Sequence, residues 1–278
     1  MIGYSVEKNS RERMEDAVSV STHGSHQILI VADGHGGAET VNYAIRHLPD
    51  LIRRELDQNQ PSFTKLFSDL DESLRSHLIP LVPDPSNSGT PSEISDHFSD
   101  LEYPLLTSGT CVCAAVVDCA ASRLRIANLG DCRALLSRGG VALQLTCDHN
   151  TRNTQENKRV AHLIDSIGYV RGLQITRSLG NFRLDSGAKV EGQLCQPESL
   201  DVQLVPGEDQ FLIMSSDGIF DVLNNDQVVD TVAAAFCRSA CPKFAAQALI
   251  DRAVARGATD NLCAVVMRLG ERDFALQM

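Results

Sequence analysis

Acidic side chains gather in five short segments spread along the chain, and each segment borders a short apolar run. The segments are Glu15-Asp16, Asp33-Gly34-His35-Gly36-Gly37, Gly130-Asp131, Asp217-Gly218 with Asp221, and Asp260-Asn261. Carboxylates at strand ends, beside glycines that let the backbone come close, supply what a hard cation needs. The pattern therefore indicates an enzyme with a divalent-cation site.

Taken singly, most of these segments have a simpler interpretation. Asp-Gly, Gly-Asp and Asp-Asn pairs are common in plain turns, and Glu15-Asp16 is typical of a charged surface pair. The segment from Asp33 to Gly37 is more distinctive, because its three glycines surround an acid and a histidine. If the first and last segments share one site, the two ends of the chain must meet, which predicts a single domain over residues 1–278.

Composition narrows the class of partner. The 278 residues are 43% hydrophobic and 22% charged, with a formal net charge of -11 and a pI near 5.1. Because nucleic acid and anionic membranes attract a basic face, we expect neither as the main partner. Bound divalent cations would make the site less negative than the whole chain, so an anionic substrate is compatible with this charge.

The cysteines indicate reduced thiols and a cytoplasmic or nuclear location. All nine lack the paired spacing of a zinc site and the density of a disulfide scaffold. Cys111 and Cys113 are expected to be structural, and Cys132 a small buried filler, with a redox role as its alternative. Residues 1–10 lack a signal-peptide pattern, and the longest apolar run, 111–121, contains Asp118, so we expect no membrane segment.

The elements that must position the acidic segments alternate between strand and helix patterns. Short apolar runs predict strands at 28–32, 110–117, 124–127, 134–136, 211–214 and 262–269. Periodic apolar positions predict helices at 38–48, 51–56, 63–78, 154–167, 226–237 and 242–256, with Pro49 kinking or ending the first. The proline-rich stretch at about 80–107 predicts a solvated insert loop, or alternatively a phosphorylated regulatory loop.

Eight motifs in sequence order resemble those of the type-2C, metal-dependent serine/threonine protein phosphatases (the PPM-type family). They are Arg11-Glu12-Arg13-Met14-Glu15-Asp16, Val31-Ala32-Asp33-Gly34-His35-Gly36-Gly37, Ser108-Gly109-Thr110, Ala127-Asn128-Leu129-Gly130-Asp131-Cys132-Arg133, Asp148-His149, Thr176-Arg177-Ser178-Leu179-Gly180, Ser216-Asp217-Gly218-Ile219-Phe220-Asp221 and Thr259-Asp260-Asn261. The resemblance implies an α+β fold: a four-layer α-β-β-α sandwich with two central antiparallel sheets and a metal site at one end.

The resemblance also implies roles for the acidic residues. Asp33 matches the carboxylate that contacts both ions of a two-ion site. The residues expected to complete it are Glu15 and the Gly34 carbonyl for one ion, Asp217 and Asp260 for the other, and Asp131 with Asp217 and Asp221 for a weaker third ion. Oxygen-only ligands favour Mg²⁺ or Mn²⁺ over zinc. Asp16 is expected to orient the attacking water.

The implied reaction is hydrolysis of phosphoserine or phosphothreonine by a water that two cations activate, without a covalent phosphoenzyme. Arg11 matches the family's phosphate-binding arginine, and its planar fork suits two phosphoryl oxygens; Arg13 is the alternative. His35 is expected to be the general acid that protonates the departing oxygen. The alternative is a histidine that only hydrogen-bonds neighbouring carboxylates.

Two departures from the family pattern bear on activity. Gly180-Asn181 stands where the family usually has Gly-Asp, which predicts reduced or retuned activity, and residues 168–173 are short where the family often has a longer flap beside the active site. A low-activity, phosphatase-like adaptor is therefore the alternative function, and a cation-binding structural domain is the third. Phosphorylated proteins are the expected partners, and the chain is expected to be a monomer.

Overall fold

Two antiparallel sheets form the centre of the fold. The computed structural model describes residues 1–58, 62–78, 107–183 and 185–270, so the predicted insert loop lies outside the described residues except at its last position. The first sheet has the order β1 (Ile2–Glu7), β11 (Leu262–Arg268), β10 (Asp209–Ser215), β6 (Arg133–Arg138) and β7 (Val141–Gln144). The second has the order β2 (Asp16–His23), β3 (His26–His35), β4 (Gly109–Asp118), β5 (Arg123–Leu129) and β9 (Glu198–Gln203), and β8 (Leu179–Gly180) pairs with β4.

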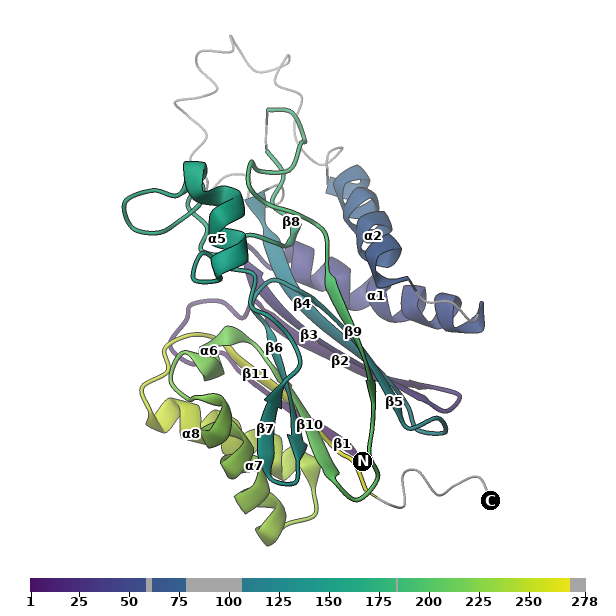
Figure 1. Ribbon diagram of the computed structural model, residues 1–278. Coiled ribbons are helices and arrows are strands. Elements are labelled where there is room, and N and C mark those ends of the chain that lie inside the picture. The colour runs from purple at the N-terminus through teal and green to yellow at the C-terminus, as the bar shows by residue number, and fades with distance from the viewer. Residues whose placement is uncertain (59–61, 79–106, 184, 271–278) are drawn as a thin grey trace.

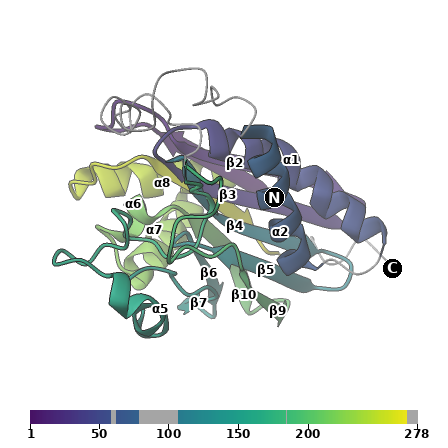
Figure 2. The same ribbon diagram turned by 90° about the horizontal axis from the view of Figure 1, so that it is seen from above.

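Helices cover the outer face of each sheet (Figures 1 and 2). The second sheet carries α1 (Glu39–Asp57) and α2 (Phe63–Leu78), and the first carries α7 (Asn225–Arg238) and α8 (Pro242–Ala255). The shorter elements are α5 (Thr154–Val160), the 3₁₀ turn η3 (Ala161–Leu163) and α6 (Asp217–Phe220). This arrangement confirms the predicted α+β sandwich.

Alternation along the strands builds the two sides of the second sheet. In β3, Ile28 and Ile30 pack toward α1 and α2, whereas Leu29 and Val31 pack into the core between the sheets. Because strand side chains alternate, Asp33 continues the inward row of Leu29 and Val31. Burying each aliphatic side chain of this core contributes roughly 1.5–3 kcal/mol. The apolar row thus carries a carboxylate to the end of the sandwich.

The strands near the site are longer than the sequence indicates. Asp33, Gly34 and His35 belong to β3 and pair with Cys111, Thr110 and Gly109 of β4, so this strand extends beyond the predicted 28–32. Five further strands were not predicted from the sequence: β1, β2, β7, β8 and β9. The physical reason is plainest for β9, because its side chains are mostly exposed and give little apolar signal.

Two helix predictions also need correction. Pro49 does not end the first helix, because α1 continues through it to Asp57. Pro49 and its neighbours Leu48 and Ile52 are buried, and this packing offsets the missing backbone donor. The helix predicted at 154–167 stops as an α-helix at Val160. Beyond it, Asp165 accepts the N–H groups of Ile167 and Tyr169, which favours a local turn over a further helical turn.

Candidate active site

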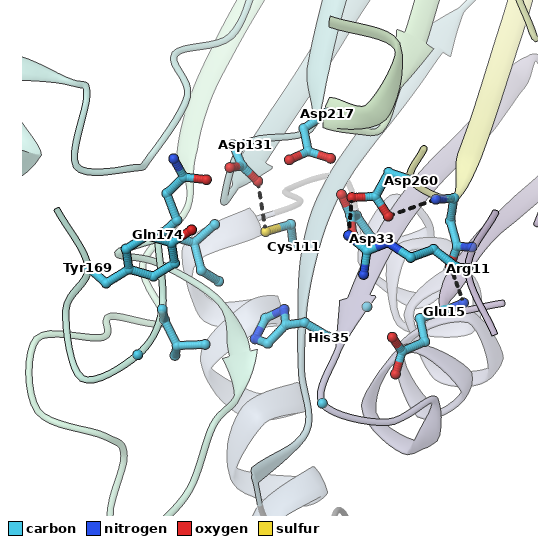
Figure 3. A pocket seen from close by; sticks show the side chains of 16 residues that line it. Arg11, Glu15, Asp33, His35, Cys111, Asp131, Tyr169, Gln174, Asp217 and Asp260 are labelled. Atoms are coloured by element: carbon cyan, nitrogen blue, oxygen red, sulfur yellow. Dashed lines mark hydrogen bonds and ion pairs between the residues drawn. The ribbon is translucent and has the colours of Figure 1, made fainter. Parts of the chain in front are cut away.

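Three aspartates meet at one end of the sandwich, between the two sheets (Figure 3). Carboxylate oxygens of Asp33, Asp131 and Asp217 lie within 4.8 Å of one another. Asp33 comes from β3 and Asp131 from the turn between β5 and β6. Asp217 is the first residue of α6, one residue beyond the end of β10. The fold therefore joins three of the acidic segments that are far apart in the sequence.

Burial, together with neighbouring carboxylates, shifts the pKa values of these three aspartates upward in the metal-free protein. Loss of hydration raises the pKa of Asp33 well above its ordinary value, and the charges of Asp16 and Asp217 add to the effect. Burial, followed by the charge of Asp131, raises the pKa of Asp217 to about 8. The pKa of Asp131 is raised mainly by burial. A cation bound among these oxygens would favour the ionised carboxylates and so lower their pKa values.

Asp16 lies beside Asp33 but behind the cavity. The two residues are paired in register across β2 and β3. The Ser216 hydroxyl donates to the Asp16 carboxylate at 2.6 Å, yet burial still raises the pKa of Asp16 to about 6. Asp16 is not among the residues that line the cavity. Asp16 thus lies next to Asp33 without facing the cavity, and Ser216 is a hydrogen-bond partner that was not predicted from the sequence.

The cavity has a volume of about 300 Å³. Its acidic wall carries Asp33, Asp131, Asp217, Asp260 and Glu15, as Figure 3 shows. The opposite wall is residues 172–175 with Tyr169, which overlaps the short segment 168–173 expected beside the site. An acidic wall therefore faces a neutral one across a space large enough for a phosphoryl group.

Arg11 is the arginine at this cavity. Its guanidinium contacts the Asp260 carboxylate at 2.6 Å, and its side chain is 55% exposed. Arg13 does not line the cavity; its backbone carbonyl accepts from the Asn261 side chain at 3.0 Å. The structure thus favours Arg11 over Arg13 for phosphate contact. Because Arg11 is paired with only one carboxylate oxygen, other donors of its planar group remain for a ligand.

Asn261 holds the N-terminal segment in place. Its side-chain oxygen accepts the Glu15 N–H at 2.7 Å, and its amide group donates to the Lys8 carbonyl at 2.8 Å. The sequence noted Asn261 only as the neighbour of Asp260. This contact attaches the first acidic segment to the last one.

Glu15 contacts the glycine segment of β3 and does not join the cluster of three aspartates. Its carboxylate accepts the Gly37 N–H at 2.6 Å, and its carbonyl accepts the Gly34 N–H at 2.9 Å. A Cβ atom on Gly34 would lie 2.6 Å from that carbonyl oxygen, so only glycine fits this approach.

Asp131 is held by residues that the sequence analysis did not connect with it. The Cys111 thiol donates to one of its oxygens at 3.2 Å, and the Asn150 amide approaches the other at 3.5 Å. His149 makes two hydrogen bonds with Gly130, the residue before Asp131. Its ring Nδ1 accepts the Gly130 N–H, and its backbone N–H donates to the Gly130 carbonyl. Cys111 therefore lines the site, although it was predicted to be structural only, whereas Cys132 is a fully buried part of the core.

Asp221 is placed outside this cavity. It follows Asp217 by one helical turn and lies 4.0 Å from Arg152, with 53% of its side chain exposed. It lines a neighbouring open hollow together with Arg133 and Asn225. Its charge still raises the pKa of Asp217, so Asp221 acts on the site through the electric field.

His35 contacts the side-chain amide of Asn181, whereas the alternative interpretation expected hydrogen bonds to neighbouring carboxylates. Its Nε2 lies 2.9 Å from the side-chain oxygen of Asn181, and it lines the cavity. Burial lowers the pKa of His35, and the nearby charge of Lys189 acts in the same direction. Asn181, named in the sequence analysis only as a departure from the family, is thus a direct neighbour of the candidate acid.

Glu156 of α5 is the centre of a network of ion pairs and hydrogen bonds. The Glu156 carboxylate, 3% exposed, accepts from Arg177, Arg159 and Thr176. Although burial opposes it, hydrogen bonding from the two arginines lowers the pKa of Glu156 to about 2. Glu156 belongs to no motif of the sequence analysis, because nothing local marks a helix residue that pairs with a distant arginine.

The donor set fits hard divalent cations. The candidate ligands are carboxylate or carbonyl oxygens, and the charges of Asp131 and Asp217 add to the burial that raises the pKa of Asp33. Oxygen ligands of this kind suit Mg²⁺, Mn²⁺ or Ca²⁺ rather than zinc.

Two sheets between helical layers, with an acidic cluster at one end that could hold a metal ion, make up the architecture of this chain. The sequence model of the family described as "Protein phosphatase 2C" matches residues 3–262, and the chain belongs to this family. The resemblance found from the eight motifs is therefore confirmed. Membership in this metal-dependent family supports protein phosphatase activity.

Curated relatives carry the same kind of name. The chain is 32% identical over 245 residues to "Probable protein phosphatase 2C 27" of Oryza sativa subsp. japonica, covering 85% of this chain and 63% of the relative. It is 29% identical over 282 residues to "Protein phosphatase 1K, mitochondrial" of Xenopus laevis, covering 97% and 68%. The chain thus spans about two thirds of the length of these relatives.

Solved structures share the fold. One, described as the structure of a C. elegans sex determining protein, has a TM-score of 0.76 at 22% identity and covers 99% of this chain and 66% of that chain. Another, serine-threonine phosphatase 2C from Toxoplasma gondii, has a TM-score of 0.69 at 16% identity and covers 96% and 94%.

Within the described residues, the helices are all too short or too polar to cross a membrane.

Proposed function

We propose that this chain hydrolyses phosphoserine and phosphothreonine monoesters on proteins, with two Mg²⁺ or Mn²⁺ ions as cofactors. The observation that carries the proposal is the group of Asp33, Asp131 and Asp217, whose carboxylates adjoin one another at a cavity edged by Arg11. Burial disfavours the ionised form of these carboxylates in the metal-free protein. A bound cation would favour the ionised form, and the chain belongs to a metal-dependent phosphatase family.

The residues present can hold the ions as the resemblance implies. Asp33, Glu15, Gly34, Asp217 and Asp260 all line the cavity. By the resemblance, Asp33 would serve both ions, Glu15 and the Gly34 carbonyl one of them, and Asp217 and Asp260 the other. Asp131 adjoins Asp217 and would serve a third ion. When bound, divalent cations neutralise charge on phosphoryl oxygens and make a water a stronger nucleophile at neutral pH.

The protein groups supply binding and proton transfer. Arg11 reaches the cavity rim with donors left for two phosphoryl oxygens. Asp16, paired with Asp33 across β2 and β3 and held by the Ser216 hydroxyl, would orient the attacking water from behind the candidate ligands, as the resemblance implies. His35 gives its proton to the departing serine or threonine oxygen.

Hydrolysis of a phosphopeptide and of a small aryl phosphate tests the proposal. We expect turnover with Mn²⁺ or Mg²⁺, none after chelation, and a large loss in Asp33→Asn. Asp69→Asn is the matched control, because it removes the same charge from an exposed position on α2. A phosphotyrosine peptide of the same sequence tests the choice of residue.

Each outcome decides between the alternatives. Hydrolysis that survives chelation would contradict the proposed cofactors. A chain that binds Mn²⁺ and phosphopeptide without turnover would be the low-activity adaptor, and one that binds Mn²⁺ but no phosphopeptide would be the structural domain.

A further inference from the structure

Asn181 contacts the candidate acid and two further groups at once. Its side-chain oxygen lies 2.9 Å from His35 Nε2 and 2.6 Å from the Ser178 hydroxyl, and its amide nitrogen donates to the Thr107 carbonyl at 2.9 Å. An amide oxygen only accepts hydrogen bonds. Because the opposite end of the same amide donates to a carbonyl, the orientation of Asn181 is set, and His35 Nε2 must be the donor.

We propose that Asn181 is a positioning residue that keeps the proton on His35 Nε2 and so leaves Nδ1 as the nitrogen that protonates the departing oxygen. The inference rests on the proposed general-acid role of His35. In the step, the Nδ1–H bond breaks and an O–H bond forms on the serine or threonine oxygen. The ring returns as the neutral form with its hydrogen on Nε2, still donating to Asn181.

The backbone holds Asn181 in a conformation that suits few side chains. Its φ is 52° and that of Gly180 is 73°, so two successive residues are left-handed, a region where asparagine and glycine are the most tolerant. The Gly180 N–H donates to Asp71 at 2.7 Å, and the Lys189 ammonium donates to the Gly180 carbonyl at 2.8 Å and to Asp71 at 2.7 Å. This partly buried ion pair therefore fixes both polar groups of Gly180.

Gly109 of β4 makes room for the contact. A Cβ atom at this position would lie 2.1 Å from the Asn181 oxygen and 2.4 Å from His35 Nε2. Any larger residue would push the two groups away from the strand. A substitution at Gly109 thus disturbs the contact without altering either partner.

An amide fits this position better than a carboxylate. In Asn181→Asp an oxygen would face the Thr107 carbonyl oxygen, at the 2.9 Å now spanned by a donor and an acceptor. The other oxygen can still accept from Ser178 and His35. The aspartate variant therefore keeps the contact with His35 and loses only the attachment to Thr107.

The first experiment reads the tautomer of His35 directly. Two-bond ¹H–¹⁵N correlation spectra of the neutral imidazole in the full chain show which nitrogen carries hydrogen. We expect Nε2–H in the wild type and in Asn181→Asp, and loss of this preference in Asn181→Gly, which removes the side chain without straining the backbone. A wild-type Nδ1–H form would overturn the inference whether or not the chain hydrolyses phosphate.

The second experiment is a double-mutant cycle with an alkyl phosphate, whose departing oxygen needs a proton. We expect Asn181→Gly and Gly109→Ala each to lower kcat by about 10–100-fold, the range for groups that orient a functional imidazole. KM is expected to change little, and Asn181→Asp to stay within a few fold of the wild type. In a His35→Ala background, Asn181→Gly should add no further loss.

The outcomes separate this inference from the proposed function. Equal losses from Asn181→Gly with and without His35 would show that Asn181 supports the fold in general, and would overturn the positioning role. A wild type with the Nε2–H form but no turnover with any divalent ion would remove the proposed function, while the Asn181 contact would stand.

Discussion

The metal-free protein is expected to lose stability as the pH rises, because its cation site holds carboxylates that resist ionisation. The pKa of Asp217 is raised from 3.8 to about 8. Between these values the folded chain binds a proton that the unfolded chain has released. The stabilising contribution of the protonated Asp217 carboxyl is therefore fully present below the pKa of the unfolded chain, and it is lost as the pH rises through the pKa of the folded chain.

The size of the effect follows from the slope of about 1.4 kcal/mol per pH unit for one group. From about pH 5 to about pH 7, Asp217 alone accounts for roughly 3 kcal/mol, a large share of a typical domain stability of about 5–15 kcal/mol. Asp33 and Asp131 act in the same direction. Glu156, with a pKa of about 2, stays ionised over this range and adds no slope.

Urea unfolding in the presence of a chelator measures this effect when the wild type is compared with Asp217→Asn. The variant keeps the shape of the side chain and cannot ionise, so we expect it to be the more stable form at neutral pH, by a margin that grows with pH. With Mn²⁺ present, the order reverses, because the variant has lost a metal ligand. Asp69→Asn, which removes an exposed carboxylate on α2, is the control variant.

Histidines with lowered pKa values make the folded chain more stable as the pH rises toward about 6.5, and so oppose the effect of Asp217. The quantity to follow is therefore the difference in unfolding free energy between the wild type and Asp217→Asn. A difference that stays constant from about pH 5 to about pH 8 would refute the reasoning. It would mean that Asp217 ionises freely in the folded chain, and the case for an uncompensated acidic cluster would fail with it.

Three further predictions concern single side chains. Arg11→Ala is expected to raise KM for a phosphopeptide by about 10–100-fold, since a charge-assisted hydrogen bond is worth about 1.5–3 kcal/mol; an equal loss of Mn²⁺ affinity in a calorimetric titration would contradict its role. His35→Gln is expected to slow alkyl phosphates more than activated aryl phosphates, and a uniform loss would make His35 a support residue. Glu156→Gln leaves Arg177 and Arg159 without their buried anion and is expected to cost about 3 kcal/mol of unfolding free energy; a change below about 1 kcal/mol would show that this network contributes little.

Much of the site could be predicted from the sequence because its residues carry local chemical signals. Asp33, Asp217 and Asp260 stand beside apolar strands and next to Gly or Asn, and their order along the chain matches a family pattern. The apolar runs likewise indicated the central strands, such as β4 and β10. These signals depend on neighbours in the sequence, where period and residue type can be read directly.

Other features depend on which segments pack together. The register of β2 against β3 places Asp16 beside Asp33, and the position of α6 turns Asp221 out of the cavity. The contact of Asn181 with His35 requires a strand from one part of the chain, a loop from another and a glycine between them. No local pattern encodes such a meeting, because its geometry follows from the packing of the two sheets and their helices. The sequence alone therefore specified the kinds of chemical group at the site, whereas the tertiary structure decided which of them touch.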